Sequence, residues 1–259
     1  MKILVAGKGF IGSETGKALE KEGHNIKYLD RKNADFEKDV TQKFELEEHF
    51  DVIIHSIGLA PGFFSAKDYY RLHVNGTRNI VDGINADKII YLSALGAGDV
   101  DHSFFRTKRE AERIIEKSGR DYTILRPSTV YGEGNKLLEL IKKTGFTRLF
   151  PNIKTRTQPI HRKDLVEVVS EIVELQDNII MDIAGKKQVS IGGLAKHLYA
   201  QEGYKCFLIP VPQFLIELGL VGLSFLPPPF QKENIKILRA ENTTEENGAE
   251  QFIDLRDIF

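Results

Sequence analysis

The sequence predicts an α/β fold in which helices cover both faces of a parallel, doubly wound sheet. Short β-rich runs alternate with helical patterns through the first half of the chain, and this alternation is typical of parallel sheets. Residues 51–56 and 88–93 are almost continuously apolar, as strands are when both of their faces are covered. Residues 2–6 lead from an apolar run through a glycine-rich turn into a helical pattern, which gives the first strand–helix unit of such a sheet.

The individual elements follow from the same patterns. We expect strands at residues 2–6, 25–30, 51–56, 88–93 and 121–126, and a weaker strand at 35–37. We expect helices at residues 11–23, 41–49, 65–85, 104–118, 135–144, 162–175, 190–203 and 212–225.

The pattern changes in the second half of the chain. Prolines and longer loops become frequent after residue 127, which predicts a smaller α/β part that packs against the sheet and is not a separate linked module. We expect a sheet domain of residues 1–130 with parts of 150–185, and a smaller substrate-type part of residues 131–150 and 186–259. The polar, acidic residues 241–250 predict a mobile loop.

The composition is that of an ordinary globular protein. The chain has 259 residues, 41% hydrophobic and 28% charged, with a formal net charge of −1. Because so balanced a charge gives no broad attraction to nucleic acid, we expect no nucleic-acid partner. The single cysteine, Cys206, excludes an internal disulfide and favours a reducing, cytoplasmic setting. The longest apolar stretch, residues 214–226, is too short to span a bilayer, so we expect no transmembrane segment.

Residues 7–12 read Gly-Lys-Gly-Phe-Ile-Gly and form a G-x-G-x-x-G motif between a strand and a helix. In this context the motif indicates a dinucleotide-binding loop of the Rossmann type. The first glycine permits the turn, the second lets the backbone approach a pyrophosphate, and the third lets helix and strand pack closely. The helix N-terminus offers N–H groups and a positive dipole end to the phosphates. The expected binding residues here are Gly7, Lys8, Gly9, Phe10, Ile11 and Gly12.

The residues at the end of the second strand bear on the choice of dinucleotide. Asp30 follows the glycines by about 20 residues, where an acidic side chain binds the ribose hydroxyls of the adenosine. Its charge disfavours the 2′-phosphate of NADP, whereas the guanidinium of the adjacent Arg31 is suited to hold that phosphate. The two residues point to opposite cofactors, and we expect NAD or NADP with a slight preference for NAD.

Other candidates lie where further strands end, because ligands of doubly wound sheets bind beyond the carboxyl ends of the strands. Asp39 and Val40 are placed to flank the adenine, and Gly58 lets the cofactor lie close to the chain. The additional expected cofactor-binding residues are Asp39, Val40, Ser56, Ile57, Gly58, Ser93 and Pro127.

Longer motifs make the chain similar to a known superfamily. Residues 73–79 read His-Val-Asn-Gly-Thr-Arg-Asn, residues 126–132 read Arg-Pro-Ser-Thr-Val-Tyr-Gly, and residues 159–165 read Pro-Ile-His-Arg-Lys-Asp-Leu. With the glycine loop, these motifs resemble the extended and atypical short-chain dehydrogenase/reductases, which include NAD-dependent epimerases and dehydratases. Within that superfamily, residues 92–97, 108–112 and 226–230 look like the subgroup of the nucleotide-binding accessory subunit of respiratory complex I.

The resemblance implies a catalytic set from which this chain departs. The superfamily's hydride chemistry uses a Tyr four residues before a Lys, with a Ser or Thr nearby. Lys108 stands at the Lys position, where the resemblance implies contact with the nicotinamide ribose. Phe104 stands at the Tyr position and cannot transfer a proton. The hydroxyl position falls on Ala94, with the candidate Ser93 one residue early, and the glycine loop is one residue shorter than the usual extended form.

Two functions are open on this basis. The first is a nucleotide-binding or redox-sensing protein that lacks standard Tyr-dependent hydride chemistry. The second is an active oxidoreductase, or a nucleotide-sugar epimerase or dehydratase relative, in which His73 or Tyr131 supplies the proton instead. Either reading leaves an unknown small-molecule substrate or protein partner.

Two further features are expected to be structural. The apolar residues 207–230 are expected to wall a second pocket, the alternative being docking on a partner or, peripherally, on a membrane. Asp99, Asp101 and His102 share one loop without further ligands, so we expect a solvated loop there and no metal site.

Overall fold

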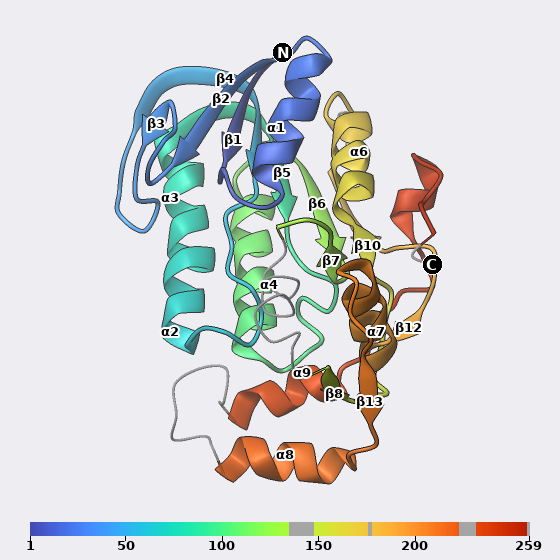
Figure 1. Cartoon of the computed structure of the whole chain (residues 1–259). Coiled ribbons are helices and arrows are strands. Elements are labelled where there is room, and N and C mark those ends of the chain that lie inside the picture. The colour runs from blue at the N-terminus through green and yellow to red at the C-terminus, as the bar shows by residue number, and fades with distance from the viewer. Residues whose placement is uncertain (135–147, 176–177, 223–231, 258–259) are drawn as a thin grey trace.

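A seven-stranded parallel sheet forms the centre of the molecule (Figure 1). The computed structural model describes residues 1–134, 148–175, 178–222 and 232–257. The strands run in the order β11-β6-β5-β4-β1-β2-β3, and the neighbouring strands are parallel. The predicted α/β class with a doubly wound sheet is therefore confirmed. The strands are β1 (Lys2–Ala6), β2 (Asn25–Asp30), β3 (Phe36–Glu37), β4 (Leu46–His55), β5 (Ile84–Leu92), β6 (Asp121–Pro127) and β11 (Ile179–Ile183).

The strand order reverses between β1 and β4. From β1 the sheet grows through β2 to β3 on one side, and through β4, β5, β6 and β11 on the other. Ligands of such sheets bind at this reversal, beyond the carboxyl ends of the strands. Ala6 and His55, the last residues of β1 and β4, are paired. The glycine loop and residues 56–58 therefore leave the sheet next to each other.

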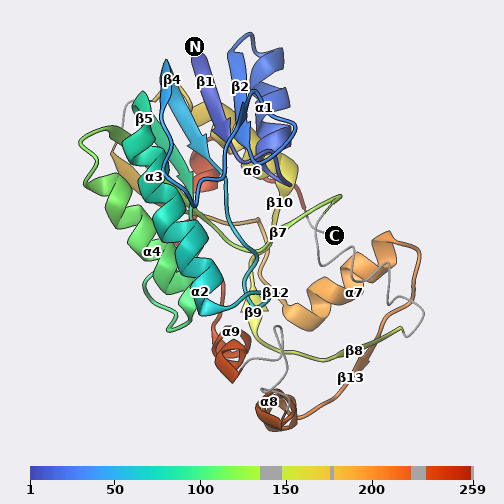
Figure 2. The same ribbon diagram turned by 90° about the vertical axis from the view of Figure 1, so that its left-hand side faces the viewer.

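Helices cover both faces of the sheet, and this explains the continuous apolar runs. Ile53 and Ile54 are both 0% exposed and belong to different hydrophobic clusters on the two faces. One face carries α1 (Gly12–Lys21) and α6 (Arg162–Ile172), and the other carries α3 (Gly76–Gly83) and α4 (Ser103–Glu116) (Figure 2).

Outside the main sheet, the described residues form three two-stranded sheets, and we call the region around them the smaller part. Its strands are β7 (Val130–Tyr131) with β10 (Ile160–His161), β9 (Arg156–Thr157) with β12 (Val189–Ser190), and β8 (Leu149–Pro151) with β13 (Phe207–Ile209). Its helices are α7 (Ile191–Gln201), α8 (Gln213–Gly222), η2 (Lys232–Asn234) and α9 (Ile235–Arg239), whereas η3 (Gly248–Gln251) packs against β11 of the main sheet. In the described parts of the chain, no helix is long and apolar enough to cross a membrane.

Residues 41–49 do not form the helix that their pattern predicts. β4 begins at Leu46 and β5 begins at Ile84, both earlier than expected, and these first residues pair with each other before a shift of register. The early pairing buries Phe50 and Ala86. This tertiary contact outweighs the local preference, as is common for strands.

The edge strand β11 was not expected from the sequence. Residues 179–183 pair with residues 123–127 of β6. A five-residue apolar run of this kind is ambiguous between strand and helix when it is read alone.

The helix expected at 65–85 is divided by a π-helical turn. α2 (Ala66–Tyr69) starts at the capping residue Ser65 and leads through η1 (Tyr70–Asn75) into α3. The expected helices at 104–118, 162–175, 190–203 and 212–225 correspond to α4, α6, α7 and α8. The helix expected at 135–144 and the motif at 226–230 lie outside the described residues.

Residues 241–250, where the sequence predicts a mobile loop, are hydrogen-bonded to the rest of the fold through two asparagines. The side-chain oxygen of Asn242 accepts a hydrogen bond from the Thr129 backbone N–H at 3.0 Å, and its amide nitrogen donates to the Leu95 carbonyl at 3.0 Å. Asn247 makes an equivalent pair of bonds with the backbone of Ala184 at 2.9 and 3.0 Å. The side-chain amides of Asn242 and Asn247 therefore hold this segment beside the residues that follow β5, β6 and β11.

Candidate dinucleotide site

The glycine loop leaves β1 in a conformation that needs two of its three glycines. Gly7 has a φ of 103°, a value that favours glycine. A Cβ atom on Gly12 would lie 1.9 Å from the carbonyl oxygen of Gly7, so no other residue fits there. A Cβ atom on Gly9 would meet nothing within 4 Å. The loop is therefore closed against the fold at Gly7 and Gly12, and it is open to a ligand at Gly9.

The end of β4 is bonded to this loop. The Ser56 hydroxyl lies 3.0 Å from the carbonyl oxygen of Ala6 and 2.9 Å from that of Gly7, within hydrogen-bonding distance of both. A Cβ atom on Gly7 would also lie 2.9 Å from a side-chain carbon of Ile57. The structure thus brings the predicted residues 56–57 against the predicted loop, although the side chain of Ser56 faces the loop's backbone.

Asp30 lies at the mouth of the same loop. Its carboxylate accepts a hydrogen bond from the backbone N–H of Lys8 at 2.7 Å and from that of Arg31 at 2.7 Å. The Arg31 side chain is exposed, while Nζ of Lys8 donates to the carbonyl of Asn33 at 2.9 Å. The acidic group therefore stands beside the glycine turn, where the motif predicts the ribose contact.

Asp39 and Val40 lie in the connection that follows β3. The Asp39 carboxylate accepts bonds from the backbone N–H and the hydroxyl of Thr41 at 2.9 and 2.8 Å, and these bonds lower its pKa. Val40 is buried, and its side chain lies so close to Gly76 that a Cβ atom there would be 3.2 Å away. Both residues are held by local contacts at the edge of the site.

Lys108 reaches the strand ends from α4. Its side chain is buried, and Nζ donates to the Leu92 carbonyl at 2.7 Å and lies 4.7 Å from the centroid of the Tyr91 ring. A Cβ atom on Gly58 would lie 3.2 Å from this Nζ. Burial lowers the pKa of Lys108 to about 7, against a smaller opposing effect of Glu112. The lysine and Gly58 therefore meet where β4 and β5 end.

Ser93 and Ala94, the two residues at or next to the hydroxyl position, make different contacts. Ser93 donates its hydroxyl to the buried Glu112 at 2.5 Å, and the same carboxylate binds Arg126 at 2.9 and 2.7 Å. Ala94 lies in the hydrophobic cluster that contains Phe104. The hydroxyl of Ser93 is therefore bonded to a charged group on α4, and the residue beside Phe104 has no hydroxyl.

Phe104 is the centre of a group of aromatic rings. It is 5% exposed, and its ring centroid lies 4.9 Å from that of Phe105, 5.6 Å from that of Tyr69 and 5.5 Å from that of His73. We call this group the aromatic cluster. Its members are Tyr69, Ala94, Phe104 and Phe105, with Leu59, Phe64, Val100 and Ile237 packed against them.

His73 lies in the π-helical turn with both ring nitrogens bonded. Its Nε2 accepts from the Leu59 backbone N–H at 3.1 Å, so its Nδ1 carries the proton and donates to the Thr107 hydroxyl at 2.9 Å. That hydroxyl in turn lies 2.9 Å from the carbonyl of Ser103. Burial holds the pKa of His73 well below its usual value, with a smaller effect of Lys108. The imidazole is therefore neutral and structural.

Tyr131, the other substitute donor weighed from the sequence, packs in the smaller part. It is 5% exposed and lies in a cluster with Leu194, Leu198 and Tyr199. Its ring centroid is 5.1 Å from that of His161. Tyr131 thus belongs to a different hydrophobic cluster from Phe104 and Ala94.

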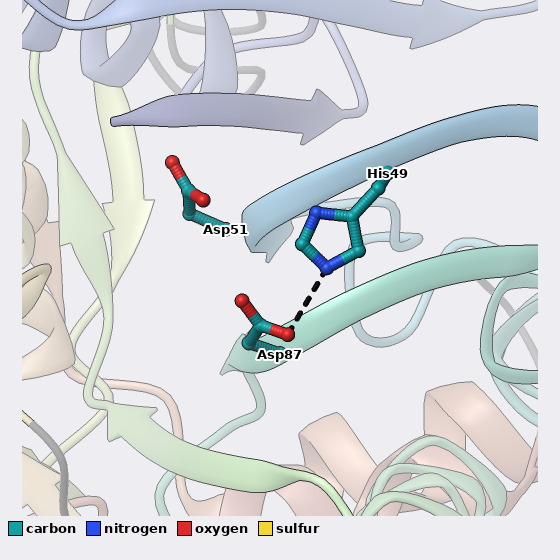
Figure 3. A group of neighbouring side chains, drawn as sticks. All are labelled: His49, Asp51 and Asp87. Atoms are coloured by element: carbon teal, nitrogen blue, oxygen red, sulfur yellow. Dashed lines mark hydrogen bonds and ion pairs between the residues drawn. The ribbon is translucent and has the colours of Figure 1, made fainter.

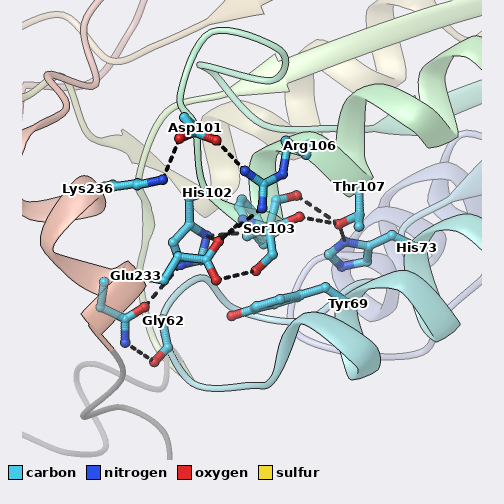
Figure 4. Close-up of polar contacts among 12 residues, drawn as sticks. Gly62, Tyr69, His73, Asp101, His102, Ser103, Arg106, Thr107, Glu233 and Lys236 are labelled. Carbon is cyan, nitrogen blue, oxygen red and sulfur yellow. Dashed lines mark hydrogen bonds and ion pairs between the residues drawn. The ribbon is translucent and has the colours of Figure 1, made fainter. Parts of the chain in front are cut away.

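A buried histidine joins the start of α4 to the C-terminal segment (Figure 4). His102 Nδ1 accepts from the Phe104 backbone N–H at 3.0 Å, so its Nε2 donates to Asn234 Oδ1 at 3.0 Å. Glu233 accepts from both the backbone N–H and the hydroxyl of Ser103. Burial lowers the pKa of His102. Sequence patterns gave no signal for this contact, because its partners are more than a hundred residues apart.

The loop of Asp99, Asp101 and His102, which the sequence predicts to be solvated, is therefore solvated only in part. Asp101 is exposed and bridges Arg106 and Lys236, whereas His102 is 1% exposed. The expectation was wrong for His102 because the C-terminal segment covers it (Figure 4).

A separate group of possible metal ligands lies on the interior strands β4 and β5, away from their carboxyl ends (Figure 3). His49, Asp51 and Asp87 place one ligand atom each within 4.8 Å of one another. His49 Nε2 is bonded to Asp87 at 3.0 Å, and Asp51 accepts from the Lys2 backbone N–H at 2.6 Å, where β1 begins. His49 and Asp87 are exposed. These bonds account for the arrangement, and we assign it no role in the dinucleotide site.

Two hollows of the smaller part lie away from the glycine loop. One, of about 450 Å³, is bordered by Phe214, Glu217 and Arg239, and the other, of about 350 Å³, by Pro210, Pro212 and Leu238. Phe214 thus borders a hollow, in line with the expectation that residues 207–230 wall a second pocket, but its side chain is 65% exposed.

The parallel sheet with its reversal, the glycine turn after β1 and the acidic residue that ends β2 define a Rossmann-type α/β protein. Residues 3–183 match the model of the NAD dependent epimerase/dehydratase family, and the chain belongs to that family. The family that the sequence motifs indicated is thereby confirmed.

One relative is the mitochondrial NADH-ubiquinone oxidoreductase 40 kDa subunit of Neurospora crassa. It is 23% identical over 135 residues, which are 50% of this chain and 35% of that protein. The match thus covers well under two thirds of the relative's length.

Several solved structures share the fold. A human epimerase family protein with NADPH is 14% identical, with a TM-score of 0.71 over 93% of this chain and 90% of that one. A dTDP-4-dehydrorhamnose reductase from Clostridium acetobutylicum is 19% identical, with a TM-score of 0.69 over 82% and 84%. A UDP-glucuronic acid 4-epimerase from Bacillus cereus, solved with NAD and a fluorinated UDP-sugar, is 20% identical, with a TM-score of 0.65 over 82% and 87%.

Proposed function

We propose that this chain binds NAD(H) or NADP(H) between the glycine loop, Asp30 and Lys108. The observation that carries the proposal is the open space at Gly9 beside the start of α1, next to the carboxylate of Asp30. An anion there meets the N-terminal N–H groups of the helix, and the ribose meets the carboxylate. We retain a slight preference for NAD, because Asp30 faces the turn while the Arg31 side chain is exposed.

We further propose that the bound dinucleotide does not support standard Tyr-dependent hydride transfer. Phe104 has no group that exchanges a proton, and its ring is packed into the aromatic cluster. Ile237 of α9 packs on that cluster, and the neighbouring His102–Asn234 bond fastens the same segment to α4. A substrate carbonyl would have to displace these contacts in order to reach the position of the missing acid. A nucleotide-binding or redox-sensing role, with a protein partner, fits this arrangement better than turnover.

One observation keeps an enzymatic role as a second candidate. Lys108 still reaches the strand ends, and burial brings its pKa to about 7, a value suited to proton transfer near neutrality. An oxidoreductase, epimerase or dehydratase would then use Lys108 or a group of the substrate as the acid. His73 is a poor alternative, since both of its nitrogens are bonded.

The test uses protein from which bound nucleotide has been removed. Calorimetric titration with NADH and NADPH is expected to give saturable binding of at least one, and ligand at 100 times its Kd should raise the free energy of unfolding by about 2.7 kcal/mol. A turnover screen with ketones, quinones and nucleotide sugars is expected to show no robust activity. Binding of neither dinucleotide would overturn the first proposal, and robust turnover would favour the enzymatic candidate.

The setting that we propose is cytoplasmic. It rests on the reducing environment suggested by a single cysteine, and a cell-fractionation experiment with the native chain tests it.

A further inference from the structure

An arginine from the second half of the chain lies against the glycine loop. Arg162 is the first residue of α6, and α6 packs beside α1 in both views (Figures 1 and 2). Its Nη1 donates to the carbonyl oxygen of Phe10 at 3.3 Å, and its guanidinium carbon lies 4.9 Å from the centroid of the Phe10 ring. The cation therefore rests on the residue that follows the open position Gly9.

The segment after β7 makes room for this side chain. Gly132 has a φ of 139°, and a Cβ atom there would lie 3.3 Å from Cβ of Arg162. A Cβ atom on Gly134 would lie 3.7 Å from the Phe10 ring and 3.9 Å from Nη1 of Arg162. Two glycines thus border the space in which the guanidinium and the ring stack.

The acidic groups around Arg162 are bonded to other cations. Glu14 on α1 pairs with Lys17 at 2.9 Å, and the buried Asp164 on α6 pairs with Arg256. Glu167 also pairs with Arg256, at 3.4 Å. Within the described residues, no carboxylate lies within 4.0 Å of the Arg162 guanidinium, and its bond to Phe10 uses one of its five N–H groups.

A guanidinium that has no described carboxylate within 4.0 Å, next to the N-terminus of a helix, is suited to a phosphate. The charge of the guanidinium and the positive dipole end of the helix both attract an anion. Arg also binds phosphate oxygens through two parallel N–H groups. We propose that Arg162 is a further dinucleotide-binding residue, whose guanidinium contacts the diphosphate over the glycine loop. This inference rests on the proposed binding of NAD(H) or NADP(H).

The adjacent Lys163 provides a matched control. It is exposed on the same turn of α6, so Lys163→Gln removes the same charge without touching Phe10. Affinities for NADH, ADP-ribose and adenosine are measured for wild type, Arg162→Gln, Arg162→Lys and Lys163→Gln by titration and saturation-transfer NMR. Thermal melting without ligand shows whether each variant folds.

Arg162→Gln is expected to weaken NADH and ADP-ribose about tenfold, because one charged hydrogen-bonded contact is lost. Adenosine, which has no phosphate, should bind as weakly as it does to wild type. Arg162→Lys should lose about threefold to tenfold, since it keeps the charge without the planar fork, and it decides the matter if Arg162→Gln does not fold. Lys163→Gln should change affinity by less than about twofold.

Three results would overturn the inference while leaving the proposed function intact. The first is an unchanged affinity of Arg162→Gln for NADH or, if that variant does not fold, of Arg162→Lys. The second is an equal loss of affinity in Lys163→Gln, and the third is an equal loss of affinity for adenosine in Arg162→Gln. Failure of wild type to bind NADH, NADPH or ADP-ribose would instead remove the proposed function, and the inference with it.

Discussion

Phe104 and Lys108 lie one helical turn apart on α4, and they end in opposite environments. The ring of Phe104 packs among Tyr69, His73 and Phe105, whereas the ammonium of Lys108 donates to the carbonyl of Leu92 where β5 ends. The spacing of an acid and its activating lysine is thus retained without the acid. In this chain, α4 therefore presents a cation to the strand ends and an apolar ring to the core.

Phe104→Tyr tests whether the hydroxyl alone is missing. General acid–base help typically contributes about 10²- to 10⁴-fold, so a trace activity should rise if Lys108 is placed to activate a tyrosine. We expect little gain, because the ring is held inside the aromatic cluster. The measurement is turnover of NADH and NADPH with ketones, quinones and nucleotide sugars, and Phe105→Tyr on the same helix serves as the control. A gain in turnover of 100-fold or more in Phe104→Tyr alone would show that a substrate reaches residue 104 inside the aromatic cluster.

Lys108→Met is expected to stabilise the protein while it weakens dinucleotide binding. The pKa of Lys108 is about 7 in the folded protein and 10.5 as its ordinary value, so the unfolded chain holds the proton more firmly between these values. Folding stability contributed by this group is therefore lowest below pH 7 and rises as the pH increases towards 10.5. A neutral side chain of similar length should raise the free energy of unfolding at pH 7 by about 1–3 kcal/mol.

Urea unfolding at pH 7 and pH 9 measures this change. The advantage of Lys108→Met over wild type should shrink at pH 9. A destabilised variant at pH 7 would mean that the bond to the Leu92 carbonyl outweighs the cost of burying the charge.

Gly9 and Gly12 should respond differently to the same added methyl group. Gly12→Ala places a Cβ atom 1.9 Å from the Gly7 carbonyl, so it should destabilise the fold by several kcal/mol, about 3 or more. A Cβ atom on Gly9 meets nothing within 4 Å, so Gly9→Ala and the bulkier Gly9→Val should leave the melting temperature nearly unchanged while they reduce dinucleotide affinity. Thermal melting and titration with NADH separate the two effects. Intact binding in Gly9→Val would place the pyrophosphate elsewhere.

Asp30 and Arg31 should shift cofactor preference in opposite directions. Asp30→Ala removes the charge that repels a 2′-phosphate and should move preference towards NADP, by about tenfold or 1.4 kcal/mol. Arg31→Ala should move it towards NAD. The ratio of the Kd values for NADH and NADPH is the readout. Wild type that binds NADPH more than tenfold better would show that Arg31 dominates.

Acid should destabilise the protein through its buried histidines. Burial lowers the pKa of His55 to about 3, and it also lowers the pKa of His73 and His102. Because these folded-state values lie below the ordinary 6.5, the unfolded chain binds protons that the folded protein rejects. The stability from each neutral histidine is complete above pH 6.5 and falls as the pH drops towards its folded pKa, by about 1.4 kcal/mol per unit.

Urea unfolding between pH 7.5 and 5 follows this loss. His102→Gln should flatten the pH dependence, whereas His24→Gln, at a residue on the surface, should not. A wild-type stability that stays constant to pH 5 would contradict the neutral, bonded state of His73 and His102.

Local patterns predicted most of the main sheet and the glycine turn, because both depend on short sequence ranges. Continuous apolar runs and Gly7 to Gly12 are read within a dozen residues. The early start of β4 was missed because the pairing of Leu46 with Ile84 is a tertiary contact with no local signature. The helix predicted at 41–49 failed for the same reason.

The contacts that the second half of the chain makes with the first half could not be predicted either. Asn242, Arg162 and Asn234 meet the strand ends or the loops from 114 to 172 residues away. An asparagine or arginine in a polar stretch carries no sign of its partner. The environment of Phe104 was likewise hidden, since the sequence shows the missing hydroxyl but not the rings of Tyr69 and His73 around it.

The π-helical turn η1 sets the rotational phase of everything that follows it on the same helix. A π turn closes its hydrogen bonds one residue later than an α turn does, and one residue corresponds to a rotation of about 100° in an α-helix. If the same residues were wound as an α-helix, α3 would turn about its axis, taking Thr77 from its bond with His55 at 2.8 Å and Ile80 from the core. The π turn thus holds one residue more than an α turn would, and in doing so it keeps both the polar and the apolar contacts of α3 aligned with the sheet.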